Sequence, residues 1–232
     1  DVSKNELDFA VQKGNAFVLH QEISNDTKSI ANFFKELKKL SDFDLSKAII
    51  CMEHTGIYNN PLLMYLYEKQ GNICLESALQ IKNSQGNLRG KNDKIDSIRI
   101  AEYAYTFREK LKLWQPKREV IQRLSMLTAD RNRLIVAKNS LTVPLKERAG
   151  FFSKTLQKAS EKLFAKTLKA IDSDLESIEK VIKEVIKADE ELNRLFNLIT
   201  SIQGIGEATA IGIILTTNEF KDINDPKKFA CY

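Results

Sequence analysis

Apolar and polar residues alternate near the start of the chain, where polar side chains separate Leu7, Phe9 and Val11. A period of two is typical of a β-strand with one buried face. Residues 13–15, Lys-Gly-Asn, form a turn signal between this strand and a second apolar run. The pattern predicts an antiparallel hairpin and then a third strand near residues 18–23.

Helical spacing and short apolar runs follow in turn. Residues 24–26 offer an N-cap to a helix with apolar positions three and four apart. The apolar run at 48–52 has the length of a buried central strand and ends at Glu53. A helix over 61–69 and a strand over 73–75 come next. Strands that alternate with helices after a hairpin predict an α/β domain with a mixed sheet.

The pattern changes after Trp114, where long stretches carry apolar residues at helical spacing. The first long helix is predicted to be interrupted near Pro144 and Gly150. The second runs through 175–199, and its apolar spacing breaks only at Asp189. Two such helices predict either an antiparallel coiled-coil arm or a simple helical bundle.

A glycine-rich turn with Gly204 and Gly206 precedes a helix of small and apolar residues at 208–215. This order resembles a helix-hairpin-helix, in which backbone N–H groups bind a phosphate. The glycines serve equally well to let two helices cross closely. The pattern alone leaves both interpretations open.

Composition narrows the class of protein. The net charge of +5 is compatible with a polyanionic partner and does not require one. The three cysteines lack the CxxC spacing of a structural zinc site and fit a reducing compartment. No apolar run reaches the roughly 18 residues of a membrane span, and no signal peptide is recognisable. We therefore expect a cytoplasmic protein.

Both ends of the sequence are unusual for an intact chain. Asp1 stands in place of an initiator methionine, inside a predicted strand, and residues 229–232 form an apolar run. We expect the sequence to be a piece of a longer protein.

Four carboxylates stand where an α/β sheet can bring them together. Asp1 belongs to the first strand and Glu53 follows the buried central strand. Asp93 and Asp96 are three residues apart at the start of a predicted helix, a spacing that points both the same way. Aspartates at helix starts are more often caps, so the helix pair alone decides little. Clustered carboxylates repel unless a cation lies among them, which predicts a Mg²⁺ or Mn²⁺ site for phosphoryl transfer.

Three short motifs carry a family resemblance. Residues 1–4, 52–56 and 91–97 resemble, in order and spacing, the three blocks of the DEDD transposases of one bacterial insertion-sequence family. Residues 202–232 resemble the opening of that family's second conserved domain. Asn92 departs from the threonine that the family commonly has, and both carboxylates remain.

The resemblance implies a fold of class α/β plus all-α. A ribonuclease-H-like, RuvC-like catalytic domain with a mixed sheet spans 1–112. A helical coiled-coil arm for dimerisation spans 113–197, and 198–232 begin a helical transposase domain with the helix-hairpin-helix-like motif.

The resemblance also implies a bacterial DNA transposase. Asp1, Glu53, Asp93 and Asp96 bind Mg²⁺ or Mn²⁺ in such an enzyme, and a nucleophilic serine lies beyond Tyr232. A structured non-coding bridge RNA pairs with donor and target DNA, and the helical arm joins copies into a dimer or tetramer. Basic residues beside the acidic site are candidates for phosphate contacts, as are the two glycines of the turn; these candidates are Lys91, Lys94, Arg99, Gly204 and Gly206.

Two other functions fit the residues. A metal-dependent junction resolvase or nuclease would use water in place of the serine. A nucleic-acid-binding dimerisation module would use the carboxylates only structurally.

Overall fold

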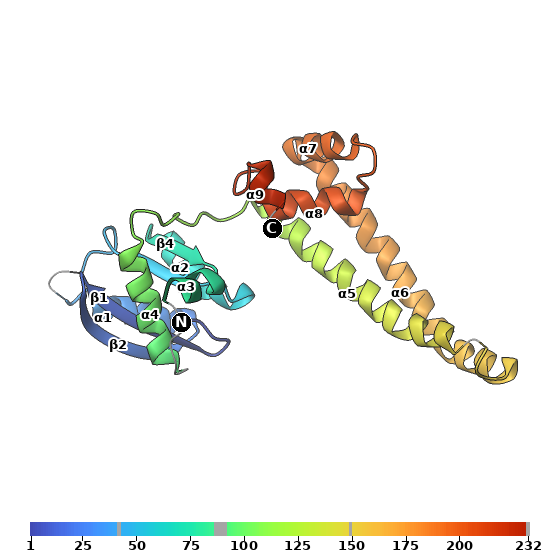
Figure 1. The fold of residues 1–232 in the computed structure, drawn as a ribbon, viewed down its shortest axis with the longest axis horizontal. Coiled ribbons are helices and arrows are strands. Elements are labelled where there is room, and N and C mark those ends of the chain that lie inside the picture. The colour runs from blue at the N-terminus through green and yellow to red at the C-terminus, as the bar shows by residue number, and fades with distance from the viewer. Residues whose placement is uncertain (41–42, 86–91, 149, 231–232) are drawn as a thin grey trace. The chain divides into compact units, whose positions relative to one another are not determined.

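The computed structural model describes residues 1–40, 43–85, 92–148 and 150–230. The chain divides into two compact units, Asp1–Gln115 and Pro116–Tyr232 (Figure 1). Within the described ranges, no helix has both the length and the apolarity that crossing a membrane requires.

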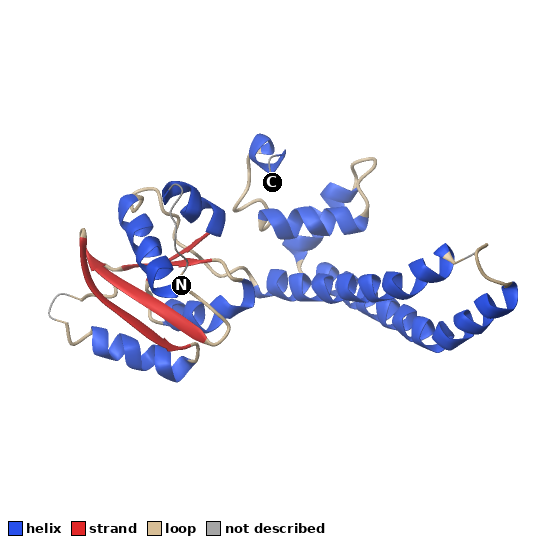
Figure 2. Cartoon of the chain, turned by 60° about the horizontal axis from the view of Figure 1, so that its bottom comes forward, coloured by secondary structure: helices blue, strands red, loops and turns tan. Residues whose placement is uncertain are grey.

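Unit 1 is a mixed α/β unit, as the sequence predicts. Its elements among the described residues are β1 (Glu6–Lys13), β2 (Ala16–Ser24), α1 (Thr27–Leu37), β3 (Ile49–Glu53), the 3-10 turn η1 (Gly56–Asn59), α2 (Asn60–Glu68), β4 (Asn72–Glu76), α3 (Ala78–Gln85) and α4 (Asp93–Thr106). The antiparallel pair β1–β2 and the parallel pair β3–β4 form separate two-stranded sheets (Figure 2). The third strand predicted near 18–23 is wrong, because those residues continue β2, whose end at Ser24 pairs with Glu6.

Helices cover the two faces of these sheets. Apolar side chains of α1 and α2 pack with Leu7 and Met52 in the main core of unit 1, and Phe9 and Val11 lie against it. The opposite face carries α3 and α4, where Ile81, Ile100 and Tyr103 pack with Cys51. Because side chains alternate along a strand, even-numbered residues of β1 and odd-numbered residues of β3 face α4. The candidate metal ligands described below lie on this α4 face or on α4 itself.

Unit 2 is helical. Its elements are α5 (Glu119–Glu147), α6 (Lys154–Ala188), α7 (Glu190–Thr200), α8 (Glu207–Thr217) and α9 (Pro226–Ala230). The interruption predicted near Pro144 and Gly150 is confirmed, since α5 ends at Glu147 and α6 begins at Lys154. Pro144 lies in the last turn of α5, where a proline removes one backbone hydrogen bond close to an end that has unpaired groups anyway. The predicted break at Asp189 is confirmed, since this residue separates α6 from α7 and caps α7.

The core of unit 2 gathers at one end of the α5–α6 pair. Ile121 and Leu124 of α5 pack with Ile182 of α6 and with apolar residues of α7 and α8. Further along, ion pairs connect the two helices: Arg131 to Glu179 at 2.7 Å and Lys138 to Asp172 at 2.6 Å. Beyond the core, Leu145 is the one buried apolar residue among those described in α5 and α6.

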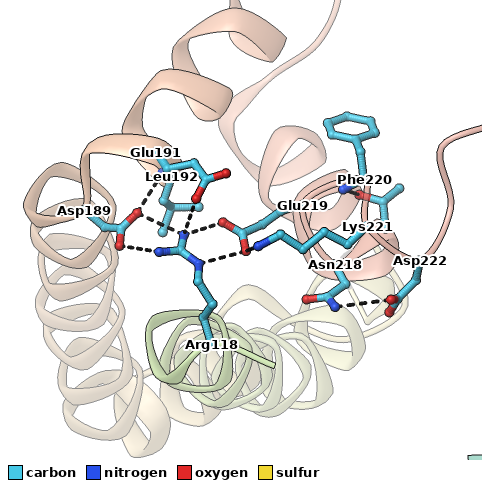
Figure 3. A network of polar contacts seen from close by, with 10 residues as sticks. Arg118, Asp189, Glu191, Leu192, Asn218, Glu219, Phe220, Lys221 and Asp222 are labelled. Carbon is cyan, nitrogen blue, oxygen red and sulfur yellow. Dashed lines mark hydrogen bonds and ion pairs between the residues drawn. The ribbon is translucent and has the colours of Figure 1, made fainter. Parts of the chain in front are cut away.

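A polar network joins three elements of unit 2 (Figure 3). Arg118 precedes α5 and donates to both carboxylate oxygens of Asp189, at 2.7 and 3.0 Å. The same guanidinium binds both oxygens of Glu219, whose side chain is fully buried and also accepts from Lys221 at 3.0 Å. Glu219 has a positive φ, as do its neighbours Asn218 and Phe220. The network therefore holds three consecutive non-glycine residues in a left-handed backbone conformation that such residues seldom adopt.

Candidate metal centre

Glu53 ends β3 beside the end of a parallel neighbour. Its register partner on β4 is Glu76, so two carboxylates lie side by side at the carboxyl edge of this sheet. The side-chain amide of Asn59 donates to the Glu53 carbonyl oxygen at 2.8 Å and fixes the backbone where the strand ends. Both glutamates are half-buried. This edge thus carries two negative charges, of which the sequence analysis identified one.

The prediction that Asp1 belongs to the first strand is wrong, because β1 begins at Glu6; Asp1 is joined to β1 by its backbone. Its amino group donates to the Asp8 carbonyl oxygen at 2.7 Å, and the Asp8 N–H donates to the Asp1 carbonyl oxygen at 3.1 Å. This exchange is the pattern of directly opposed residues in an antiparallel ladder, so the two side chains share one face. Asp8 faces α4 by the alternation of β1, and Asp1 therefore does so as well.

Asp93 and Asp96 lie in the first turn of α4, which begins after the N-cap Asn92. The Asn92 side chain accepts from the Lys94 N–H at 2.9 Å and so takes the capping role itself. Asp93 is exposed. Asp96 accepts from the guanidinium of Arg99 at 2.9 Å. The capping explanation for these two aspartates therefore loses its force, since Asn92 supplies the cap.

Electrostatic interactions connect three of the four predicted residues. Burial lowers the pKa of the Asp1 amino group to about 6, and the charges of Asp8, Glu53 and Asp93 oppose that shift. Charge interactions weaken with separation. The carboxylates of Asp8 on β1, Glu53 on β3 and Asp93 on α4 are therefore near enough to the Asp1 amino group to act on its charge. Glu53 and Asp93 thus lie within electrostatic range of the Asp1 amino group.

The donor set fits a hard divalent cation, because every candidate ligand is a carboxylate oxygen. Among the described residues, however, no three acidic, histidine or cysteine side chains stand close enough to hold a metal ion. The carboxylates thus share a layer without forming a coordination shell.

Asp8 extends this acidic layer and was missed as a candidate. His20 Nε2 lies 2.7 Å from Asp8 Oδ1, and both side chains are largely buried. Glu76 was missed although it follows an apolar strand in the same way as Glu53. The rule that selected Glu53 applied to Glu76, whereas Asp8 seemed to be only the polar half of an alternating strand.

The predicted nucleic-acid contacts have varied surroundings. Lys94 is exposed on the first turn of α4, and Arg99 is held by Asp96. Lys91 lies outside the described residues. Gly204 has a φ of +91°, and neither at Gly204 nor at Gly206 would an added Cβ meet another atom within 4 Å. Open space at both glycines disfavours the alternative that they permit a close helix crossing.

Comparisons with known proteins bear directly on this arrangement. Residues 1–147 match the model of the DEDD transposase family of the IS110 type, whose description is "Transposase". The chain belongs to this transposase family. The match contains all four predicted carboxylates and confirms the family resemblance of the three motifs.

A curated relative agrees with that membership. The transposase chain is 25% identical over 243 aligned residues to the pilin gene-inverting protein of Moraxella bovis, an alignment covering 100% of this chain and 69% of the relative. The relative's name describes inversion of a gene, which is a DNA rearrangement.

Proposed function

We propose that this transposase chain binds Mg²⁺ or Mn²⁺ through Asp1, Glu53, Asp93 and Asp96 and uses that site for DNA strand cleavage and transfer. One observation carries the proposal: Glu53 lies beside Glu76 at the carboxyl ends of β3 and β4, and Asp1 is paired with Asp8 on the face that α4 covers. A divalent ion would draw these carboxylates together, because it offsets the repulsion between their negative charges.

Each residue has a physical role in this proposal. A bound divalent ion would stabilise negative charge on the phosphate oxygens during strand cleavage. The backbone of Glu53 is held at the strand end by the hydrogen bond from Asn59. This restraint reduces the conformational entropy that would be lost when the Glu53 carboxylate binds a metal. Asp96 is oriented by Arg99, at 2.9 Å. Glu76 adds negative charge beside Glu53 and thereby strengthens the attraction for a cation.

Basic residues near α4 would bind the DNA backbone. Lys94 projects from the turn that also carries Asp93, and Arg99 lies one turn further along. A phosphate held there would lie beside the acidic layer. We assign Lys91 to the same role from its place in the motif alone.

The turn between α7 and α8 is a second proposed contact. The N-cap of α8 is Gly206, which has no side chain to accept from the N–H groups of the first turn. Gly204 supplies the positive φ of the turn. A phosphate of DNA, or of the bridge RNA that the family resemblance implies, would find those N–H groups accessible.

Self-association through the α5–α6 arm completes the proposal. Several large apolar side chains on this arm are exposed, and Phe151 and Phe152 between the helices are 86% and 55% exposed. Apolar side chains gathered in this way favour contact with a second apolar surface. Residues 113–197 would then supply a dimer or tetramer contact, and 198–232 would begin the domain that supplies the serine beyond Tyr232.

The test uses the full-length transposase and DNA carrying the element ends. We expect strand cleavage and transfer with Mg²⁺, and loss of both with a chelator or in the variants Glu53→Gln and Asp93→Asn. The control Glu68→Gln changes an exposed glutamate at the end of α2 and should retain activity. Cleavage that persists in both site variants would refute the proposed metal ligands.

The same assay separates the two alternatives. Metal-dependent hydrolysis by this chain without the downstream domain would indicate a nuclease. Retained DNA or RNA binding without any cleavage in the full-length protein would indicate a binding module.

A further inference from the structure

The net charge of the chain is concentrated in one part of the α5–α6 arm. Residues 146–169, which we call the arm tip, contain seven basic and two acidic residues and therefore carry a charge of +5. This charge equals the net charge of the whole chain. The remainder of α6, residues 170–188, contains five acidic and three basic residues and leads toward the core of unit 2 (Figure 1). The arm is thus basic at its tip and mildly acidic nearer the core.

Five lysines of α6 follow one another at helical spacing along the arm tip. They are Lys154, Lys158, Lys162, Lys166 and Lys169. At 1.5 Å of rise per residue, this row is roughly 22 Å long. All five residues are exposed, and none of them forms an ion pair with another residue that the structure describes. We call this row the lysine stripe.

The lysine stripe lies on a side of α6 that α5 does not cover. Between residues 154 and 169, the half-buried side chains recur three or four positions apart and mark the side of α6 that packs against α5. These side chains belong to Gln157, Ser160, Phe164 and Leu168. No lysine of the stripe is among them, so the five ammonium groups are accessible to a partner molecule.

The stripe brings like charges close together. Side chains three or four residues apart are neighbours on a helix, and like charges at this spacing destabilise it. Each lysine of the stripe has another lysine at such a distance, and Glu161 is the one acidic residue in the sequence from 154 to 169. Nearer the core the arm pairs its charges instead, as in the ion pair between Lys138 and Asp172. The uncompensated charge of the stripe favours a polyanionic partner.

The chemistry of the stripe favours a DNA duplex over other partners. Sites for single-stranded RNA combine positive charge with aromatic side chains on which the bases stack. The residues beside the lysines on this side of α6 include Thr155, Glu161 and Ala165, which offer no such ring. A second copy of the arm tip carries the same charge and would be repelled. A duplex carries about one phosphate charge per 1.7 Å of its length and is stiff over about 500 Å, so it can follow the whole row of lysines.

We propose that the lysine stripe binds the phosphate backbone of duplex DNA without reading its sequence. Ammonium groups contact phosphates as point charges, so the stripe contributes affinity and orients the DNA but carries no base specificity. DNA is also the substrate class of the transposase family to which the chain belongs. The contact requires no metal ion, and it is separate from the residues of α4 and from the turn between α7 and α8.

The experiment measures DNA binding by this chain with a chelator present, which removes any contribution from a bound metal ion. Fluorescence anisotropy gives the affinity for a labelled duplex of arbitrary sequence at salt concentrations from about 0.05 to 0.2 M. The stripe variant carries Lys154→Gln, Lys158→Gln, Lys162→Gln and Lys166→Gln. A second variant has arginine at the same four positions and keeps their charge.

A matched control removes the same charge from exposed positions in unit 1. It carries Lys28→Gln, Lys35→Gln, Lys38→Gln and Lys69→Gln, on or directly after α1 and α2. Circular dichroism verifies that every variant is folded. Because the lysines of the stripe are exposed, their replacement should leave the helical content unchanged.

We expect the slope of log affinity against log salt concentration to become shallower by about 3 to 4 in the stripe variant, since each phosphate contact contributes about 0.9. The affinity at the lowest salt concentration should fall at least roughly tenfold. The arginine variant and the control should keep the parental slope. Equal slopes for the parent and the stripe variant would overturn the proposal.

Two further results would also overturn it. An equal loss in the control would show that overall charge, and not the stripe, governs binding. A single-stranded RNA that binds more tightly than the duplex, with the same dependence on the four lysines, would make RNA the partner in place of DNA.

Discussion

Glu53 and Glu76 are register partners at the carboxyl ends of the parallel strands β3 and β4. Like charges directly opposite one another on neighbouring strands destabilise a sheet. We therefore expect the pair to lower the stability of unit 1 when no cation is present and to favour cation binding at the same edge.

The variant Glu76→Gln tests this relationship. In metal-free protein we expect unfolding to require about 0.5 kcal/mol more free energy, because one of the two opposed charges is removed. Its affinity for Mn²⁺ should fall. Chemical denaturation followed by circular dichroism measures the first effect, and Glu68→Gln is the exposed control. A destabilised Glu76→Gln would show that the second charge is compensated within the protein.

Two sequence features explain how much of this site could be predicted. A carboxylate after a continuous apolar run identified Glu53, and the motif spacing identified the others. Asp8 could not be recognised in that way, because its burial depends on the antiparallel partner His20 and on the cover of α4, which are long-range features. The split into two small sheets was likewise invisible, since local patterns reveal strands and not which edges remain unpaired.

In unit 2 the sequence was more informative about helices than about their connections. Three-four spacing predicted α5 and α6, and the interruption of that spacing predicted the break at Asp189. No local pattern announced that Arg118 would bind Asp189 and Glu219, which are 71 and 101 positions away. Such contacts depend on how α7 and α8 fold back onto α5.

Arg118 is expected to be a principal determinant of the stability of unit 2. The variant Arg118→Met leaves the buried Glu219 without its main partner, which costs about 3 kcal/mol. Arg118→Lys should lose less stability, because it keeps the positive charge beside Glu219. It should still lose some, because lysine lacks the paired donors of the guanidinium. The exposed Arg123→Met on the same helix is the matched control. Equal stability of the Arg118→Met and Arg123→Met proteins would contradict this role for the network.

The same network makes unit 2 sensitive to acid. Hydrogen bonds from Arg118 lower the pKa of Asp189 below its usual 3.8. Burial alone would raise the pKa of Glu219, but hydrogen bonds from Arg118 and Lys221 lower it below its usual 4.5. A lowered acid pKa adds stability above the unfolded-state value, and that stability disappears as the pH falls through the folded-state value.

We therefore expect the thermal midpoint of unit 2 to decrease as the pH is lowered from 5 to about 3. The decrease should be smaller in Arg118→Met, in which the two acids have lost the partner that lowers their pKa. Thermal unfolding at a series of pH values measures both. Parallel pH profiles for the two proteins would argue against the network as the source of the acid sensitivity.

The exposed phenylalanines between α5 and α6 give a test of self-association. Replacing Phe151 and Phe152 by serine removes apolar surface that is exposed in the single chain, so the fold should be retained while any dimer or tetramer dissociates. Sedimentation velocity measures the mass of each protein. Phe229→Ser, at another exposed apolar position, is the control. An unchanged mass distribution would place the contact elsewhere.

Metal binding tests the central claim most directly. Isothermal calorimetry with Mn²⁺ compares the parent chain with the double variant Glu53→Gln, Asp93→Asn and with the control Glu68→Gln, each shown to be folded by circular dichroism. The account predicts saturable binding to the parent and the control, and none to the double variant. Equal heats from all three folded proteins would contradict the assignment of these carboxylates to a catalytic metal centre.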